Sequence, residues 1–197
     1  MILEENFFTL LDVPQQFAVD LKRIKQRFRA LQRDYHPDRF VRSTPREQRL
    51  AVQMSAHLNT ALATLENPVS RAMHLLALQG IPFDQQQNTI RDPEFLMQQM
   101  ELRESIESVA ESNDSFALQA LVDGVAESFA HSQSVFSDLF ERFSASSSVS
   151  NQGNALDFSA QVSTAEMHRQ LIDSVGKMQF FDKLCAELKT TSRARRG

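Results

Sequence analysis

Residues 20–40 read DLKRIKQRFRALQRDYHPDRF, and this stretch decides the fold of the amino-terminal part of the chain. Apolar side chains recur at spacings of three and four and therefore line one side of a helix; they are Leu21, Ile24, Phe28, Leu31 and Tyr35. A second stripe at the same spacing, here called the basic face, consists of Lys22, Lys25, Arg29 and Arg33. The stretch predicts an amphipathic helix that buries its apolar side and concentrates positive potential on the other.

The tripeptide His36-Pro37-Asp38 ends this helix, because proline disfavours helical geometry at the residue before it and restricts its own backbone torsion. A second helix begins at Thr44-Pro45-Arg46-Glu47, a capping box with proline in the first turn. Its apolar stripe consists of Ala51, Met54, Leu58, Leu62 and Leu65. Two such helices can pack antiparallel by their apolar stripes. The basic face and a stiff His-Pro-Asp turn would then be exposed together as an interaction site.

Proline, glycine and polar residues divide the chain into two domains. Phe7, Phe8, Leu10 and Leu11 before Pro14 indicate a short first helix, and Asn67-Pro68 begins a further helix that Gly80 ends. Ile81-Pro82 and the polar run of residues 85–88 are typical of a connector. We therefore predict an amino-terminal domain over residues 1–80, a connector over 81–91 and a carboxy-terminal domain over 92–197.

The carboxy-terminal domain is expected to contain three amphipathic helices. Asp92-Pro93 begins the first, which should run to about Glu111, and the turn Ser112-Asn113-Asp114 precedes the second. The polar stretch of residues 144–154 predicts a mobile loop, and the third helix should span about residues 157–190. The expected fold class is all-α: an antiparallel helical hairpin plus short helices, followed by a three-helix bundle or a bent antiparallel helical hairpin.

The helix after Asp92 has two apolar sides when its residues are placed at about 100° per step. One side would face the core and holds Phe95, Leu102, Ile106 and Val109. The opposite side holds Leu96, Met97 and Met100, close to the charged residues Glu101, Arg103 and Glu104. Exposed apolar residues with charged neighbours are typical of a protein-binding patch. Packing against the first domain, or scattered surface hydrophobes, would be the alternative.

When the residues of the last helix are placed at about 100° per step, Phe180 falls on one side of the helix. The opposite side holds Leu171, Val175, Met178 and Cys185. Cys185 is therefore expected to be a buried structural thiol. As the single cysteine it excludes an intramolecular disulfide and fits a reducing interior. The sequence holds no run of eighteen apolar residues and no basic leader with a long apolar segment. We therefore expect a soluble, cytoplasmic protein without a membrane partner.

Charge and composition exclude several classes of function. Residues 1–77 hold eleven Lys/Arg and eight Asp/Glu, a net charge of +3, whereas residues 78–197 hold ten and seventeen, a net charge of −7. The acidic part is a poor partner for nucleic acid. His36 and Asp38 have no sequence-marked nucleophile, the other histidines lack metal-ligand spacing, and no glycine-rich phosphate loop occurs. We therefore expect no enzymatic activity, no metal and no cofactor.

The basic face, the tripeptide and the helix signals around them together resemble the J-domain, a module that docks on DnaK-class chaperone ATPases and stimulates their ATP hydrolysis. The resemblance implies that the chaperone-binding residues are Lys22, Lys25, Arg29, Arg33, His36, Pro37, Asp38 and Arg39. Asp38 is suited to a charge-assisted hydrogen bond with an arginine of the partner.

Nearly the whole chain is similar to the HscB family of J-domain co-chaperones in iron–sulfur cluster assembly, from the opening Asn6-Phe7-Phe8 onward. The similarity rests on Phe95-Leu96-Met97, on Glu101-Leu102-Arg103-Glu104 and on Phe180-Phe181-Asp182-Lys183-Leu184. It implies a co-chaperone that binds the scaffold protein IscU, delivers it to an HscA-type chaperone and stimulates the ATPase of that chaperone. The scaffold-binding residues it implies are Arg91, Leu96, Met97, Met100, Glu101, Arg103, Glu104 and Phe180.

Two other functions stay open at this point. One is a generic J-domain co-chaperone for unfolded clients, and the other is nucleic-acid binding by the basic helix. Some positions also depart from the family pattern: Leu62 and His74 stand where relatives often have aromatic residues, and Met100 replaces a usual leucine. The exchange of leucine for methionine nearly conserves volume and should be tolerated.

Overall fold

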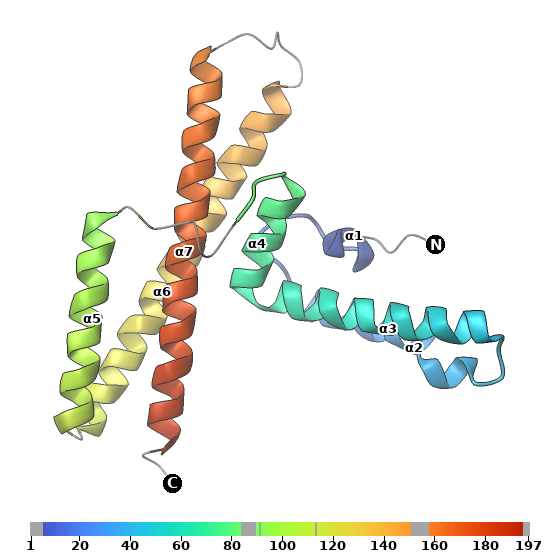
Figure 1. Ribbon diagram of the computed structural model, residues 1–197, viewed down its shortest axis with the longest axis horizontal. Helices are drawn as coiled ribbons and strands as arrows, with labels where there is room; N and C mark the ends of the chain where they lie inside the picture. Colours follow the sequence, from blue (N-terminus) through green and yellow to red (C-terminus); the bar gives the residue numbers. More distant parts are fainter. Residues whose placement is uncertain (1–5, 84–89, 91, 113, 151–157, 195–197) are drawn as a thin grey trace. The chain divides into compact units, whose positions relative to one another are not determined.

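The computed structural model describes residues 6–83, 90, 92–112, 114–150 and 158–194. All regular structure in these residues is helical, which confirms the predicted all-α fold class. The chain forms two compact units, Met1–Pro82 (unit 1) and Phe83–Gly197 (unit 2) (Figure 1). Of the predicted connector, residues 84–89 and 91 lie outside the described residues. None of the described helices combines the length and the hydropathy that crossing a bilayer requires.

Unit 1 consists of α1 (Phe7–Leu10), α2 (Leu21–Asp34), the 3-10 helix η1 (Pro37–Phe40), α3 (Pro45–Glu66) and α4 (Pro68–Leu78). Helices α2 and α3 pack side by side as the expected hairpin. The buried stripe of α2 is shorter than predicted: Ile24 and Phe28 are buried, whereas Leu21, in the first turn, is 40% exposed. On α3 the fully buried residues include Ala61, while the predicted Leu62 is only partly buried.

Local hydrogen bonds begin and end the helices of unit 1 where the sequence predicts. The carboxylate of Asp20 caps α2 by accepting from the N–H groups of Lys22 (2.8 Å) and Arg23 (3.2 Å). The capping box of α3 is formed, with the Glu47 N–H donating to Thr44 Oγ1 (3.3 Å) and the Thr44 N–H donating to Glu47 Oε2 (2.8 Å). Gly80, with a φ of +69°, ends the α4 region in the left-handed conformation that favours glycine.

His74 on α4 joins the short helix α1 to the rest of unit 1. Its Nε2 accepts a hydrogen bond from the N–H of Phe7 (3.2 Å), and its ring stacks on the rings of Phe7 (4.5 Å between centroids) and Phe8 (5.8 Å). Burial lowers the pKa of His74, because desolvation disfavours the charged imidazolium. The neutral ring is therefore the form that this packing favours.

Acidification is expected to destabilise unit 1 through His74. Because the folded-state pKa is lowered, the stabilisation is complete above the unfolded-state pKa of about 6.5 and is lost as the pH falls from there to the folded-state pKa. Tyr35 is the only tyrosine of a chain without tryptophan, so its fluorescence reports on unit 1. Urea unfolding followed at Tyr35 should show a smaller drop in unfolding free energy between about pH 7.5 and pH 5.5 for His74→Phe. Equal drops in both proteins would contradict this role of His74.

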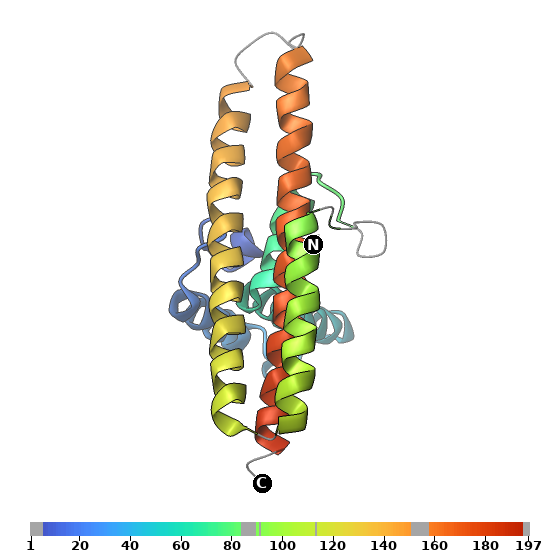
Figure 2. The ribbon, with the colours of Figure 1, turned by 90° about the vertical axis from the view of Figure 1, so that its left-hand side faces the viewer.

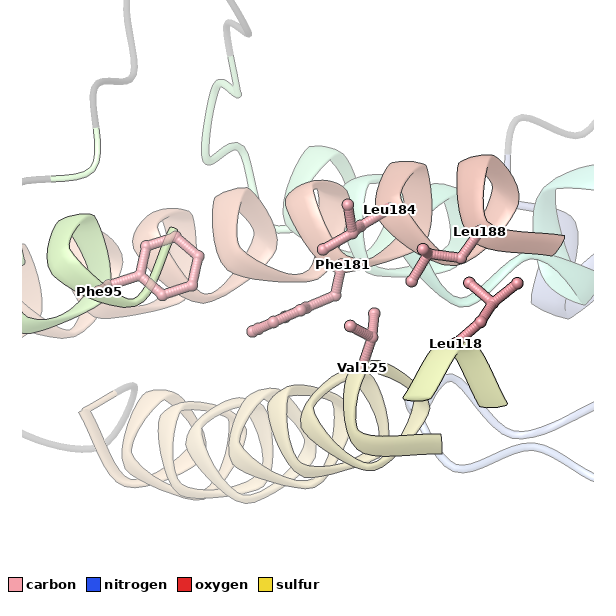
Figure 3. Packing of buried hydrophobic residues seen from close by; sticks show 6 residues of the cluster. All are labelled: Phe95, Leu118, Val125, Phe181, Leu184 and Leu188. Carbon is pink, nitrogen blue, oxygen red and sulfur yellow. The ribbon is translucent and has the colours of Figure 1, made fainter. Parts of the chain in front are cut away.

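Unit 2 consists of α5 (Pro93–Ser112), α6 (Ser115–Ser150) and α7 (Phe158–Ala194). The long helices α6 and α7 pack antiparallel, and α5 lies beside only part of this pair (Figure 2). The three helices meet in a core cluster formed by Phe95 of α5, Leu118 and Val125 of α6, and Phe181, Leu184 and Leu188 of α7 (Figure 3). Leu102, Ile106 and Val109 pack against this cluster, as the core side predicted for α5 requires. Unit 2 is thus the predicted three-helix bundle.

The expected loop after Phe143 and the expected burial of Cys185 are both wrong. Residues 144–150 are not a loop, because α6 continues to Ser150; the rest of the predicted loop lies outside the described residues. The buried residues Phe140 and Phe143 anchor this part of α6, and the Ser146 hydroxyl donates to the carbonyl of Phe143 (2.8 Å), which makes serine compatible with the helix. Cys185 is only partly buried, although desolvation still raises the pKa of its thiol.

Candidate partner-binding sites

The four cations of the basic face are exposed on α2 but differ in the partners they already have. Lys25 Nζ forms an ion pair with Glu66 Oε1 of α3 (2.9 Å). Lys22, Arg29 and Arg33 form no ion pair with any carboxylate in the described part of the chain. These three cations are therefore available to an acidic partner without the loss of an internal ion pair.

The turn after α2 is held by its own side chains. His36 caps η1, with its Nδ1 accepting from the N–H of Asp38 (3.3 Å), and Pro37 restricts the backbone. Arg39 reaches back to α2, where its guanidinium donates to the carbonyl of Arg33 (3.1 Å). The Asp38 carboxylate stays 87% exposed at 3.6 Å from His36 Nδ1 and is free to meet a partner cation. His36 and Arg39 thus shape the turn, and Asp38 is the group it presents.

Leu96, Met97 and Met100, here called the α5 patch, are exposed as the two-sided pattern of this helix predicts. Their exposed fractions are 45%, 63% and 64%, whereas Phe95 on the core side is 4% exposed. The charged residues Glu101, Arg103 and Glu104 are exposed on the same helix. An apolar patch with charges of both signs beside it has the character of a protein–protein interface.

The prediction that Phe180 faces away from the core is wrong, because its side chain is partly buried. Its ring packs edge-on against the rings of Phe95 (5.5 Å between centroids) and Phe181 (5.3 Å). The buried arc of α7 is wider than a single stripe, because both α5 and α6 pack on this part of the helix. With Arg103, Phe180 lines a cavity of about 320 Å³ whose other walls are Ile106, Glu107, Lys183, Leu184 and Glu187.

Helical periodicity and resemblance did not assign these five walls of the cavity to a site, and they did not predict the exposed Phe116, which lies outside both surfaces. Lys183 and Leu184 lie one turn from Phe180 and could have been found by helical spacing, but Ile106 and Glu107 depend on how α5 packs on α7. Phe116, in the first turn of α6, is 83% exposed because it faces away from the side that carries the buried Leu118. Arg91 lies outside the described residues.

The basic face with its turn exposes charged side chains, and the α5 patch exposes apolar ones. The described residues include no group of three or more His, Cys, Asp or Glu side chains placed to hold a metal ion. A helical hairpin with a basic face and a His-Pro-Asp turn, followed by a three-helix bundle, defines the class of J-domain co-chaperones.

Comparison with known proteins identifies the family within this class. A sequence model of the HSCB C-terminal oligomerisation domain matches residues 91–189. Chaperone HscB from Vibrio cholerae is 32% identical and similar over 96% of this chain and 98% of that one, with a TM-score of 0.72. The human co-chaperone protein HscB is 25% identical and similar over 97% of this chain and 84% of that one, with a TM-score of 0.76. The chain belongs to the HscB family of co-chaperones.

Proposed function

We propose that this protein acts in iron–sulfur cluster assembly: it binds an IscU-type scaffold protein, delivers it to an HscA-type chaperone of the DnaK class and stimulates the ATPase of that chaperone. One observation carries the proposal. The basic face and its turn lie in unit 1, and the α5 patch lies in unit 2. One molecule can therefore hold both partners, and linked sites raise the local concentration of the scaffold beside the chaperone.

In the complex with the chaperone, Asp38 would form a charge-assisted hydrogen bond to a partner cation. Lys22, Arg29 and Arg33 would contact an acidic surface, which mainly speeds encounter and selects the orientation of docking. Hydrolysis of ATP belongs to the chaperone. Docking accelerates it only if unit 1 binds the hydrolysis-competent state of the chaperone more tightly than its resting state.

In the complex with the scaffold, the α5 patch would supply the apolar contact. Methionine is unbranched and flexible, so Met97 and Met100 can adapt to the shape of the partner. Glu101, Arg103 and Glu104 would select the partner by charge. Phe180 and Arg103 line one cavity, which can receive a scaffold side chain at the edge of the contact.

The test is steady-state ATP hydrolysis by the cognate HscA-type chaperone, with this protein and an IscU-type scaffold added singly and together. Joint addition should stimulate more than the sum of the two separate additions. Stimulation that ignores the scaffold, with unfolded protein competing for the α5 patch, would instead indicate a generic J-domain co-chaperone. The absence of any stimulation would contradict the chaperone assignment.

Arg29→Ala and Arg33→Ala are expected to weaken docking on the chaperone more than Lys25→Ala. Removal of an available cation should raise the concentration needed for half-maximal ATPase stimulation about fivefold, which corresponds to about 1 kcal/mol. Lys25 must first give up its bond to Glu66 (2.9 Å), so its removal should matter less. The effects should shrink as salt is added. Arg49→Ala removes an exposed cation of α3, and a loss of equal size there would contradict a specific basic face.

A further inference from the structure

A cavity of about 930 Å³ lies in unit 2 where α5 begins, and neither proposed partner uses it. Its walls come from the start of α5 and from the facing sides of α6 and α7. The α5 residues that line it are Glu94, Phe95 and Gln98, and none of the three residues of the α5 patch is among them. The cavity is therefore distinct from the α5 patch.

The cavity exists because α5 begins partway along the pair of long helices. Asp92 ties this beginning to α7: its carboxylate accepts from Lys177 Nζ (2.5 Å) and from the N–H groups of Glu94 (3.0 Å) and Phe95 (3.2 Å). Beyond this point α6 and α7 continue as a pair that α5 does not cover (Figure 2). Helix α5 thus leaves this part of the seam uncovered, and a further helix could pack there as α5 packs lower down.

Among the ionisable side chains that line the cavity, four are acidic and two, Lys177 and His131, are basic. Asp92, Glu94, Glu127 and Asp173 line it, and Lys177, the ammonium group among the lining residues, is already paired with Asp92. Desolvation raises the pKa of Asp173, and the nearby positive charge of Lys177 offsets this only in part. A cation that entered the cavity would favour the ionised form of Asp173 and would be attracted by the other carboxylates.

Ser174 gives a second, independent indication of a ligand. This residue of α7 lines the cavity, is 4% exposed, and has no hydrogen-bond partner for its Oγ among the described residues. Buried hydroxyl groups are nearly always paired, because an unpaired one has lost its water without compensation. Apolar side chains lie close by on α6, where Leu139 is partly buried and Val135 is 38% exposed.

We propose that this cavity, here called the acidic groove, binds a basic amphipathic helix of a partner protein. The apolar side of the helix lies on Val135 and Leu139, as α5 lies on the same seam further along. A lysine or arginine side chain of the helix reaches Glu127 and Asp173, and a polar group pairs with Ser174. The α5 patch stays free, so this partner binds at the same time as the scaffold. The proposal does not depend on the chaperone or the scaffold.

The test uses the full chain and a fluorescently labelled amphipathic helical peptide with leucines on one face and lysines on the other. Anisotropy titrations should show saturable binding that weakens about tenfold in Glu127→Gln/Asp173→Asn, because two carboxylates are lost. The fold should survive, since burial already disfavours the charge of Asp173, and circular dichroism checks this. Glu111→Gln/Asp123→Asn removes two exposed carboxylates of unit 2 outside the groove and should leave binding unchanged.

Three results would overturn the proposal. Equal weakening in both double variants would reduce the binding to general attraction by the acidic half of the chain. Loss of binding in Leu96→Ala/Met97→Ala/Met100→Ala, with no effect of the groove variant, would place the peptide on the α5 patch. Self-association of the chain alone, measured by sedimentation and abolished by the groove variant, would make the occupant a second copy of this chain.

Discussion

Asp38→Asn should remove most of the stimulation of the chaperone ATPase and leave unit 1 folded. The Asp38 carboxylate is 87% exposed and lies 3.6 Å from His36 Nδ1, so its loss costs the folded state little. A charge-assisted hydrogen bond to a partner cation is worth about 1.5–3 kcal/mol. The concentration of protein needed for half-maximal stimulation should therefore rise about ten- to hundredfold in steady-state ATPase titrations.

Asp34→Asn provides the matched control for this prediction. Asp34 lies in the last turn of α2, its side chain is 69% exposed, and it stands 3.4 Å from the Arg39 guanidinium. Its replacement removes the same charge close to the turn and should change the titration by less than about twofold. Equal losses in the two variants would mean that net charge near the turn, and not the position of Asp38, governs docking.

Leu96→Ala/Met97→Ala/Met100→Ala should weaken binding of the IscU-type scaffold about hundredfold. The three side chains are 45–64% exposed, so their truncation leaves the core of unit 2 intact. Burial of apolar surface contributes about 25 cal/mol per Å², and truncation of a contacting residue at an interface costs about 1 kcal/mol or more. Three such losses amount to about 3 kcal/mol, which isothermal titration calorimetry would measure as the change in Kd.

Phe116→Ala is the control for the α5 patch, because it removes a large exposed apolar side chain (83%) from α6 in the same unit. Scaffold binding should be unchanged in this variant. ATPase stimulation in the absence of scaffold should also be unchanged in the triple variant, since unit 1 is untouched. A triple variant that keeps full affinity for the scaffold would remove the α5 patch from the proposed function.

The helix boundaries and the turn of unit 1 could be predicted from the sequence because the interactions that form them are local. Asp20, Thr44 and Glu47 place their hydrogen bonds within three residues along the chain, and Pro37 acts on its own backbone and on the residue before it. The two sides of α5 follow from the helical period in the same way. The prediction of a loop after Phe143 was wrong. Serine-rich composition is typical of mobile segments, but packing of the buried phenylalanines against residues distant in the sequence keeps α6 helical here.

The sequence by itself determined the all-α class, the basic face with its His-Pro-Asp turn and the exposure of the α5 patch, because each depends on short-range spacing. Only the tertiary structure decided which side chains of these surfaces are available to a partner and which already contact other parts of the chain. In the folded protein Lys25 is paired with Glu66, and Phe180 is partly buried beside Phe95. The acidic groove lies where Asp92 contacts Lys177, 85 residues away in the chain. Such contacts depend on how distant helices align, and no local pattern encodes that alignment.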